Sequence, residues 1–111
     1  MATDKVDAVI VELKKATVYG KRVYRGWPPV AALEPCCGVQ ETEAGIPTID
    51  RALARWNVQI DSWCKSSPDI VACKAAIKVV ADTYHSPVTH RCIPESGKTH
   101  IVSTLDVLGG S

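Results

Sequence analysis

The stretch RWNVQIDSWC, residues 55–64, decides the fold of this chain, because apolar and polar residues alternate along it. Trp56, Val58 and Ile60 fall on one side of an extended strand, and the residues between them are polar and fall on the other side. A strand of this kind belongs to a sheet with one buried face and one wet face. The phase continues back to residue 51, so we predict a long strand over residues 51–64 that sets the register of its neighbours.

Two helices are predicted from apolar residues that recur at helical spacing. In the first helix, over residues 4–16, the apolar stripe consists of Val6, Val9, Ile10 and Leu13. In the second helix, over residues 68–85, the stripe consists of Ile70, Cys73, Ile77, Val80 and Tyr84. Ser67 is the predicted N-cap of the second helix, and Pro68 is its predicted first residue, a position where proline is well tolerated.

Four shorter runs predict further strands, near residues 21–25, 33–40, 88–93 and 99–108. Gly38 inside one of them indicates a bulge or a close approach of another backbone segment. Residues 41–50 have an acidic composition with glycine and proline, which predicts a loop. The element order fits a single α+β domain over residues 1–111, with a mostly antiparallel sheet of about five strands and two helices packed on one face.

Composition and charge limit the classes of partner. The 111 residues carry a formal net charge of +1, which provides no general attraction to nucleic acid or to a membrane surface. The first residues lack the order of a secretory signal, and no apolar run reaches the ~20 residues of a membrane span. Five cysteines without a C-x-x-C pair favour free buried thiols over disulfides. We therefore expect a protein made in the cytosol that needs no membrane.

Candidate chemical groups are few. His85, His90 and Cys92 have the only spacing that approaches a metal-ligand set, and this spacing does not match the known patterns. An enzyme would need a cysteine nucleophile beside one of the three histidines, or the carboxylates of Asp61 and Glu41. The chain contains neither G-x-S-x-G nor H-E-x-x-H. These observations favour a protein that is not an enzyme and that holds no metal and no cofactor.

Candidate contact residues lie on the polar sheet face and in the irregular segments. Aromatic residues and arginine are enriched at protein interfaces, and the Trp-Pro-Pro segment at residues 27–29 is stiff. The interface candidates are Trp27, Pro28, Glu41, Glu43, Arg51, Arg55 and Trp63. A separate basic cluster with neighbouring aromatic residues offers a weaker candidate for DNA contact. Its members are Lys21, Arg22 and Arg25, with Tyr19 and Tyr24 beside them.

The chain resembles the tail-completion and tail-terminator proteins of long-tailed bacteriophages over residues 5–108. The resemblance rests on the segment VYRG at residues 23–26, the proline-rich link to the strand PCCGVQ at residues 35–40, and the strand RWNVQIDSW running into a long helix. It implies an α+β subunit that forms a ring, commonly hexameric, on the end of the tail tube. Such a ring stops tube polymerisation and offers a surface to the head connector, without catalysis.

The same resemblance implies partners and a location. The partners are further copies of this chain, the tail tube protein and a head-completion or connector protein, with DNA only passing through the ring lumen. The resemblance assigns no binding residues; that Lys21, Arg22 and Arg25 face the DNA in such a ring is a hypothesis from their basic character. The protein is then a virion component that is assembled in the cytoplasm of the bacterial host. The residues leave one alternative open, a small cytosolic interaction module of the adaptor or toxin–antitoxin type. A dimer in solution that forms no ring favours that alternative.

Overall fold

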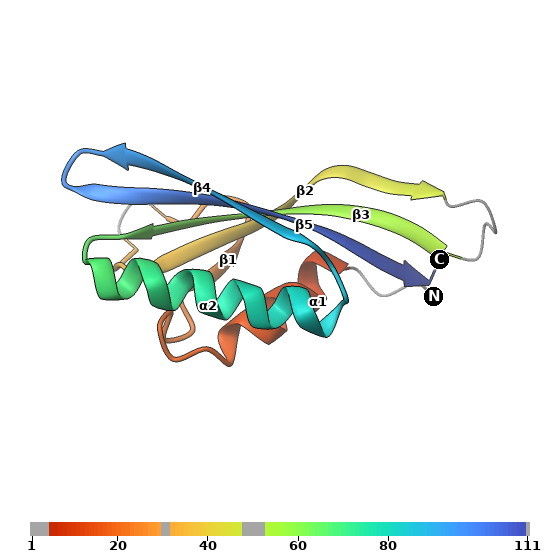
Figure 1. The fold of residues 1–111 in the computed structure, drawn as a ribbon, viewed down its shortest axis with the longest axis horizontal. Helices are drawn as coiled ribbons and strands as arrows, with labels where there is room; N and C mark the ends of the chain where they lie inside the picture. The colour runs from red at the N-terminus through yellow and green to blue at the C-terminus, as the bar shows by residue number, and fades with distance from the viewer. Residues whose placement is uncertain (1–4, 30–31, 48–52, 111) are drawn as a thin grey trace.

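A computed structural model describes residues 5–29, 32–47 and 53–110. The elements are α1 (Lys5–Lys14), β1 (Val23–Arg25), β2 (Cys36–Pro47), β3 (Leu53–Cys64), α2 (Ser67–Thr83), β4 (Val88–Glu95) and β5 (Lys98–Gly110). The five strands form one sheet in the order β1-β2-β3-β5-β4, in which β1 and β2 are parallel and all other neighbours are antiparallel. Both helices lie on the same side of this sheet (Figure 1). The predicted α+β fold is confirmed.

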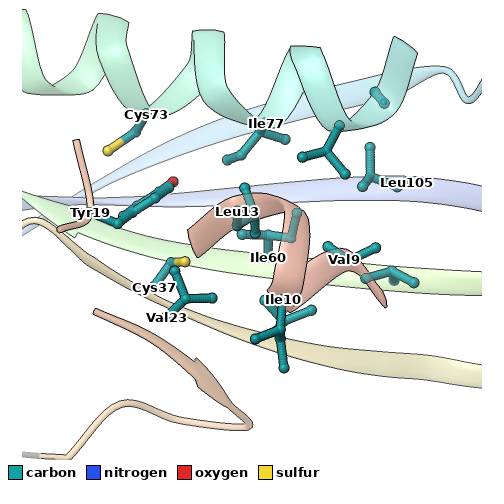
Figure 2. Packing of buried hydrophobic residues seen from close by; sticks show 14 of the residues in the cluster. Val9, Ile10, Leu13, Tyr19, Val23, Cys37, Ile60, Cys73, Ile77 and Leu105 are labelled. Carbon is teal, nitrogen blue, oxygen red and sulfur yellow. The ribbon is translucent and has the colours of Figure 1, made fainter. Parts of the chain in front are cut away.

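Strand β3 is the centre of the sheet. It pairs with β5 from Leu53 to Cys64 and with β2 on its other side. The alternation in β3 matches the burial, because Val58 and Ile60 are fully buried beneath the helices. The apolar stripes of α1 and α2 close the core over these residues (Figure 2). Removal of this apolar surface from water is the main driving force for the packing of the two helices on the sheet.

The predicted loop at residues 41–50 is wrong over residues 41–47, because β2 continues to Pro47. Residues 48–50 of that prediction lie outside the described residues. The register of β2 against β3 shifts between Glu41 and Glu43 and again between Glu43 and Ile46. Such irregularities let the strand continue through a stretch whose sequence does not alternate. The strand also begins at Cys36, after Pro35, and not at residue 33.

Strands β2, β3 and β5 reach beyond the two helices at one end of the molecule (Figure 1). The molecule measures 46 × 22 × 22 Å as a result. We call residues 40–47 the distal half of β2. This half lies beyond β1, which pairs only with residues 37–39 of β2.

The ends of the other elements differ from the predictions by a few residues. Ser66, not Ser67, is the N-cap of α2, because its Oγ accepts a hydrogen bond from Asp69 N at 3.2 Å. Two adjacent serines are both good caps, and Pro68 is also tolerated at the second position of the first turn. The β4–β5 turn is shorter than predicted, because β4 extends to Glu95 and β5 begins at Lys98.

All five cysteines are free, as predicted, and four of them are buried. Cys37 and Cys73 lie near Tyr19 in the core, where the Tyr19 hydroxyl is 2.9 Å from Ser62 Oγ. Burial raises the pKa of the Cys37 thiol, and it raises the pKa of the Cys73 thiol to about 12. A thiol keeps its proton in such surroundings because burial disfavours the charged thiolate.

We expect the free energy of unfolding to fall as pH rises above about 9. In the unfolded chain the Cys73 thiol ionises near its ordinary pKa of 9.0, whereas in the folded protein it stays protonated up to about 12. The folded state then binds more protons than the unfolded state, so stability is lost as pH rises across this interval, at no more than about 1.4 kcal/mol per pH unit for each thiol. Urea unfolding at pH 8, 9 and 10 measures this effect. Cys73→Val should reduce the slope, and an unchanged slope contradicts the prediction.

Candidate interaction surface

The sheet face opposite the helices carries the candidate site. Its residues follow from the alternation of β3 and from the register of β5. We call this surface the open face; on β3 and β5 it consists of Asn57, Gln59, Asp61, Trp63, His100, Val102, Thr104 and Asp106. Over the described residues no helix covers it, and at one end it is covered by the loop that follows β1, residues 26–29.

Gly38 allows this loop to cross the sheet. A Cβ atom at position 38 would lie 1.9 Å from the carbonyl oxygen of Gly26 and 3.0 Å from Cδ of Pro28. Gly26 itself has φ +78° and donates a backbone hydrogen bond of 2.8 Å to Val39 O. The close backbone approach predicted for Gly38 is therefore confirmed. It places Trp27 and Pro28 on the open face.

Three aromatic rings gather beside the loop. Trp63 stacks on His100 with ring centroids 4.4 Å apart and an interplanar angle of 14°. The centroid of Trp27 lies 5.6 Å from that of Trp63 and 6.4 Å from that of His100. Trp27 is nevertheless 61% exposed, which is a large apolar area for a side chain on a rigid loop. Exposed aromatic anchors of this kind are typical of protein interfaces.

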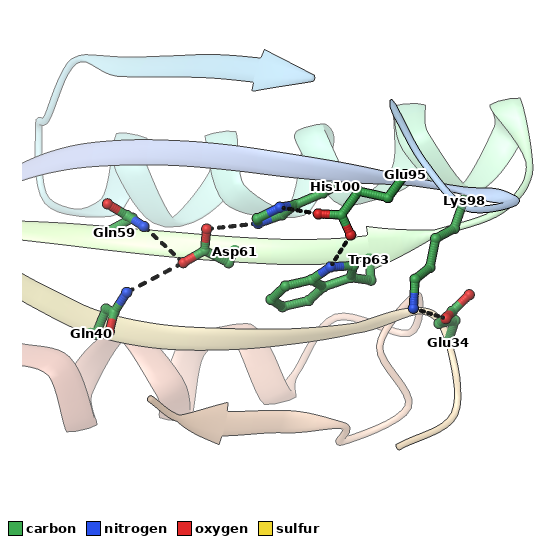
Figure 3. A network of polar contacts seen from close by, with 8 residues as sticks. All are labelled: Glu34, Gln40, Gln59, Asp61, Trp63, Glu95, Lys98 and His100. Carbon is green, nitrogen blue, oxygen red and sulfur yellow. Dashed lines mark hydrogen bonds and ion pairs between the residues drawn. The ribbon is translucent and has the colours of Figure 1, made fainter. Parts of the chain in front are cut away.

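A polar network lies beneath the rings (Figure 3). His100 Nε2 is 2.8 Å from Asp61 Oδ1, and His100 Nδ1 is 3.0 Å from Glu95 Oε1. Asp61 is only 2% exposed, and its second oxygen accepts from Gln59 Nε2 at 2.9 Å and lies 3.5 Å from Gln40 Nε2. A buried carboxylate is costly unless it is paired, and here three side chains from three strands, Gln40 of β2, Gln59 of β3 and His100 of β5, share that role.

This network holds Trp63 in place and leaves His100 without a free ring nitrogen. Trp63 Nε1 donates to Glu95 Oε2 at 3.3 Å, so the same carboxylate holds both stacked rings. Carboxylates only accept hydrogen bonds, so both contacts of His100 form when both of its ring nitrogens carry protons. Trp63 and His100, held in this way, form a rigid aromatic platform.

A hollow of about 260 Å³ opens next to the platform. It is lined by Trp27, Pro28, Pro29, Ala32, Glu34, Cys36, Trp63 and Lys98. Lys98 Nζ is 3.2 Å from Glu34 Oε1, but Glu34 Oε2 is buried and accepts no hydrogen bond within the described part of the chain. The hollow thus combines aromatic walls with the Lys98–Glu34 ion pair.

The structure places the interface candidates in two groups. Trp27, Pro28 and Trp63 meet at the hollow. Glu41 lies in the distal half of β2, and its Oε2 is buried without a hydrogen-bond partner among the described residues. Glu43 lies opposite Asn57 in the β2–β3 register, and Arg55 in β3 lies opposite Ile46 and Leu108. Arg51 lies outside the described residues.

The predicted DNA-facing cluster is less compact than its sequence indicates. Arg25 Nη1 is 2.7 Å from Asp7 Oδ1, and Arg22 Nε donates to the carbonyl oxygen of Pro35 at 2.9 Å. Lys21 is exposed, with φ +70°. Tyr19 is fully buried in the core and does not join these cations at the surface.

Sequence reasoning missed the parts of the site that come from distant segments. Glu34, Glu95, Lys98 and the role of His100 were not predicted, although Asp61 and Trp63 were assigned to the polar face of their strand. A signal was present for His100, because the alternation of the last strand places it on the same face as the polar residues of its neighbour. Nothing in the sequence marks Glu34, which precedes β2.

The groups considered for a metal site lie in two different segments. His85 is exposed just after α2, whereas His90 and Cys92 lie on β4, with His90 Nδ1 2.8 Å from Ser103 Oγ. Among the described residues, no three side chains of His, Cys, Asp or Glu are grouped as metal ligands would be. Helices within that same part of the chain are too short or too polar to cross a membrane.

Comparison with known proteins establishes the fold. Neither a scan against protein-family models nor a search of curated proteins gives a match. Among solved structures, the chain is similar to one chain of a structure described as the virion of the native gene transfer agent particle, with a TM-score of 0.62. The two sequences are 14% identical, and the similarity covers 96% of this chain and 95% of the other. At this level of identity the likeness shows a shared fold.

Proposed function

We propose that this chain is a structural virion protein of a tailed phage or a phage-like particle. In the proposed role it forms a ring that caps the tail tube and joins it to the head connector. The observation that supports this proposal most strongly is the fold shared with a chain of a gene transfer agent virion over almost the full length of both chains. The resemblance of the sequence to tail-completion and tail-terminator proteins is a second, independent support.

The surface of the molecule suits a ring subunit. The open face carries an exposed tryptophan beside a hollow, and the long strands extend past the helices. A monomer that leaves a stiff aromatic platform and strand edges uncovered has surfaces that a neighbour can bury. The proposed partners are further copies of this chain, the tail tube protein and the head-completion or connector protein, within a virion assembled in the bacterial cytoplasm.

We also propose that the protein is not an enzyme. Both ring nitrogens of His100, which stacks on Trp63 of the hollow, contact carboxylates and are not available for proton transfer to a substrate. Burial raises the pKa of the Cys36 thiol, which lines the hollow, so this thiol is a poor nucleophile at neutral pH. His100 and Cys36 therefore offer neither a free base nor an activated nucleophile at this surface.

Deletion of the gene in a host that produces the particles tests the proposed function. A subunit that stops tube polymerisation is required for tails of uniform length. We therefore expect electron microscopy of the mutant lysate to show headless tails, many of them longer than the normal length. Complementation with the intact gene is the control. Particles with tails of normal length attached to filled heads would contradict the proposal.

A further inference from the structure

The sheet has two outer edges that no strand of the described chain covers. β4 is the last strand on one side. On the other side β1 pairs with residues 37–39 of β2, so the distal half of β2 forms the rest of that edge. Uncovered edge strands present rows of N–H and C=O groups that bind a further strand readily. Figure 3 shows β4 and β1 at opposite borders of the sheet.

We propose that the distal half of β2 in one copy of this chain pairs with β4 of the next copy. This inference rests on the proposed ring, and it names the surface by which neighbouring copies meet. Residues 40–47 and the strand Val88–Glu95 are of equal length, eight residues each. The pairing continues the sheet from one subunit into the next.

Charge favours the pairing of β4 with the distal half of β2 over its pairing with the segment around β1. The distal half of β2 contains the carboxylates Glu41 and Glu43, whereas β4 contains Arg91, and the carboxylate of β4, Glu95, is engaged with His100 and Trp63 in its own subunit. Arg91 is exposed and forms no ion pair within the described residues. Opposite charges on facing strands stabilise their pairing, and like charges oppose it. The segment around β1 is basic, with Arg22 and Arg25, so β4 is better matched by the distal half of β2.

The unpaired oxygen of Glu41 supports the same choice. Glu41 lies opposite Val58, so its side chain belongs to the helix-facing side of the sheet, and its Oε2 is buried without a donor among the described residues. His90 lies on the same side of β4, because its partner is the buried Ser103. β4 of a neighbouring copy brings hydrogen-bond donors to this carboxylate oxygen. Without them, no hydrogen bond offsets the cost of removing the oxygen from water.

Strand direction predicts the symmetry of the contact. β2 and β4 run in opposite directions within one subunit, since the antiparallel pairs β2–β3, β3–β5 and β5–β4 separate them. Copies placed side by side with their sheets continuous therefore form an antiparallel β2–β4 pair. Each copy pairs through β4 with one neighbour and through the distal half of β2 with the other, and such a head-to-tail contact closes into a ring when the rotation between copies permits.

The contact requires a stagger between copies. Val88 is level with Glu41, and Glu95 is level with the end of β3, so β4 of a neighbour must shift along the strands to reach the distal half of β2. A stagger of this kind accompanies the closure of sheets into barrels. It also carries the extended strand ends onto the adjacent subunit, which explains why they reach beyond the helices.

Charge reversal with rescue is the first test. Arg91→Glu alone, and Glu41→Lys with Glu43→Lys in one variant, should each raise the concentration for half-maximal assembly about tenfold. The combination of all three substitutions should return it close to the wild-type value. Native mass spectrometry over a concentration series measures the assembly, and circular dichroism confirms that each variant is folded. Three folded variants that assemble like wild type would overturn the proposal.

Cross-linking with the native exposed thiol is the second test. Cys92 on β4 is the exposed cysteine, so a cysteine introduced at Thr42, Glu43 or Ala44 provides the second group for a short bismaleimide. Within one copy these positions are separated by β3 and β5, about 14 Å at the usual strand spacing, so a cross-link joins two copies. We expect at least one of the three variants to give a ladder of covalent oligomers. The same variant with Cys92→Ser should give none.

The outcomes separate this inference from the proposed function. Rings that form while all three variants fail to cross-link would overturn the β2–β4 contact and leave the ring intact. A single cross-linked dimer of the wild-type chain through Cys92 would show β4 paired with β4 about a two-fold axis, which also overturns the head-to-tail contact. A wild-type chain that stays monomeric under every assembly condition would contradict the proposed ring itself.

Discussion

Gly38→Val is expected to lower the free energy of unfolding by about 3 kcal/mol, because its side chain has no space. The first added carbon would lie 1.9 Å from Gly26 O, a backbone atom that a rotamer change cannot move aside. Either the loop at residues 26–29 lifts from the sheet or the strand shifts, and both lose packing of Trp27 on Trp63. Urea unfolding monitored by circular dichroism measures the loss.

Gly97→Ala is the matched control for this substitution. Gly97 has φ +73°, so alanine is strained there, but no atom lies within 4 Å of the added Cβ. Its expected cost is about 1 kcal/mol, from backbone conformation alone. If Gly38→Val costs no more than Gly97→Ala, the loop does not rest against the sheet as described. The tryptophan fluorescence of Gly38→Val should also change, since two of the three tryptophans meet at this contact.

Asp61→Ala is expected to cost about 3 kcal/mol, since it breaks a buried network and leaves its partners in place. His100 loses the acceptor at its Nε2, and the amide of Gln59 loses the acceptor at 2.9 Å. Groups buried without partners keep the full cost of their desolvation. Chemical unfolding measures the loss of stability, and proton NMR of the Trp63 indole N–H shows whether the surroundings of the Trp63 ring change.

Two further variants control for this prediction. Glu95→Gln changes the exposed end of the same network and should cost less than about 1 kcal/mol. A double-mutant cycle of Asp61→Ala with His100→Ala should give a coupling energy of about 1–2 kcal/mol. Equal costs for Asp61→Ala and Glu95→Gln, or a coupling energy near zero, would show that the contact at 2.8 Å contributes little to the folded state.

The fold was predictable because its main signals are local. The alternation of residues 55–64 predicts one buried and one polar face, and the helical stripes predict the elements that cover the buried face. Gly38 was likewise recognisable as a place of close backbone approach. Each of these predictions depends on a period or a residue type that acts within a few positions of the chain.

The candidate site was only partly predictable because it depends on register and on distant contacts. The register irregularities at Glu41 and Glu43 hide the distal half of β2, since a bulge removes the period that identifies a strand. Asp61 looks like a solvent-exposed residue in sequence, yet it is 2% exposed and its carboxylate contacts Gln59 and His100. The hollow joins Glu34 and Lys98 from segments 64 residues apart, a separation that no local pattern reports.

Native mass spectrometry of the wild-type protein across concentration, with and without magnesium, tests the central claim that the sheet is an assembly surface. We expect one closed oligomer of defined copy number, a hexamer, that grows at the expense of the monomer without a ladder of larger species. Only monomer at all concentrations, or a dimer that never proceeds further, would contradict it.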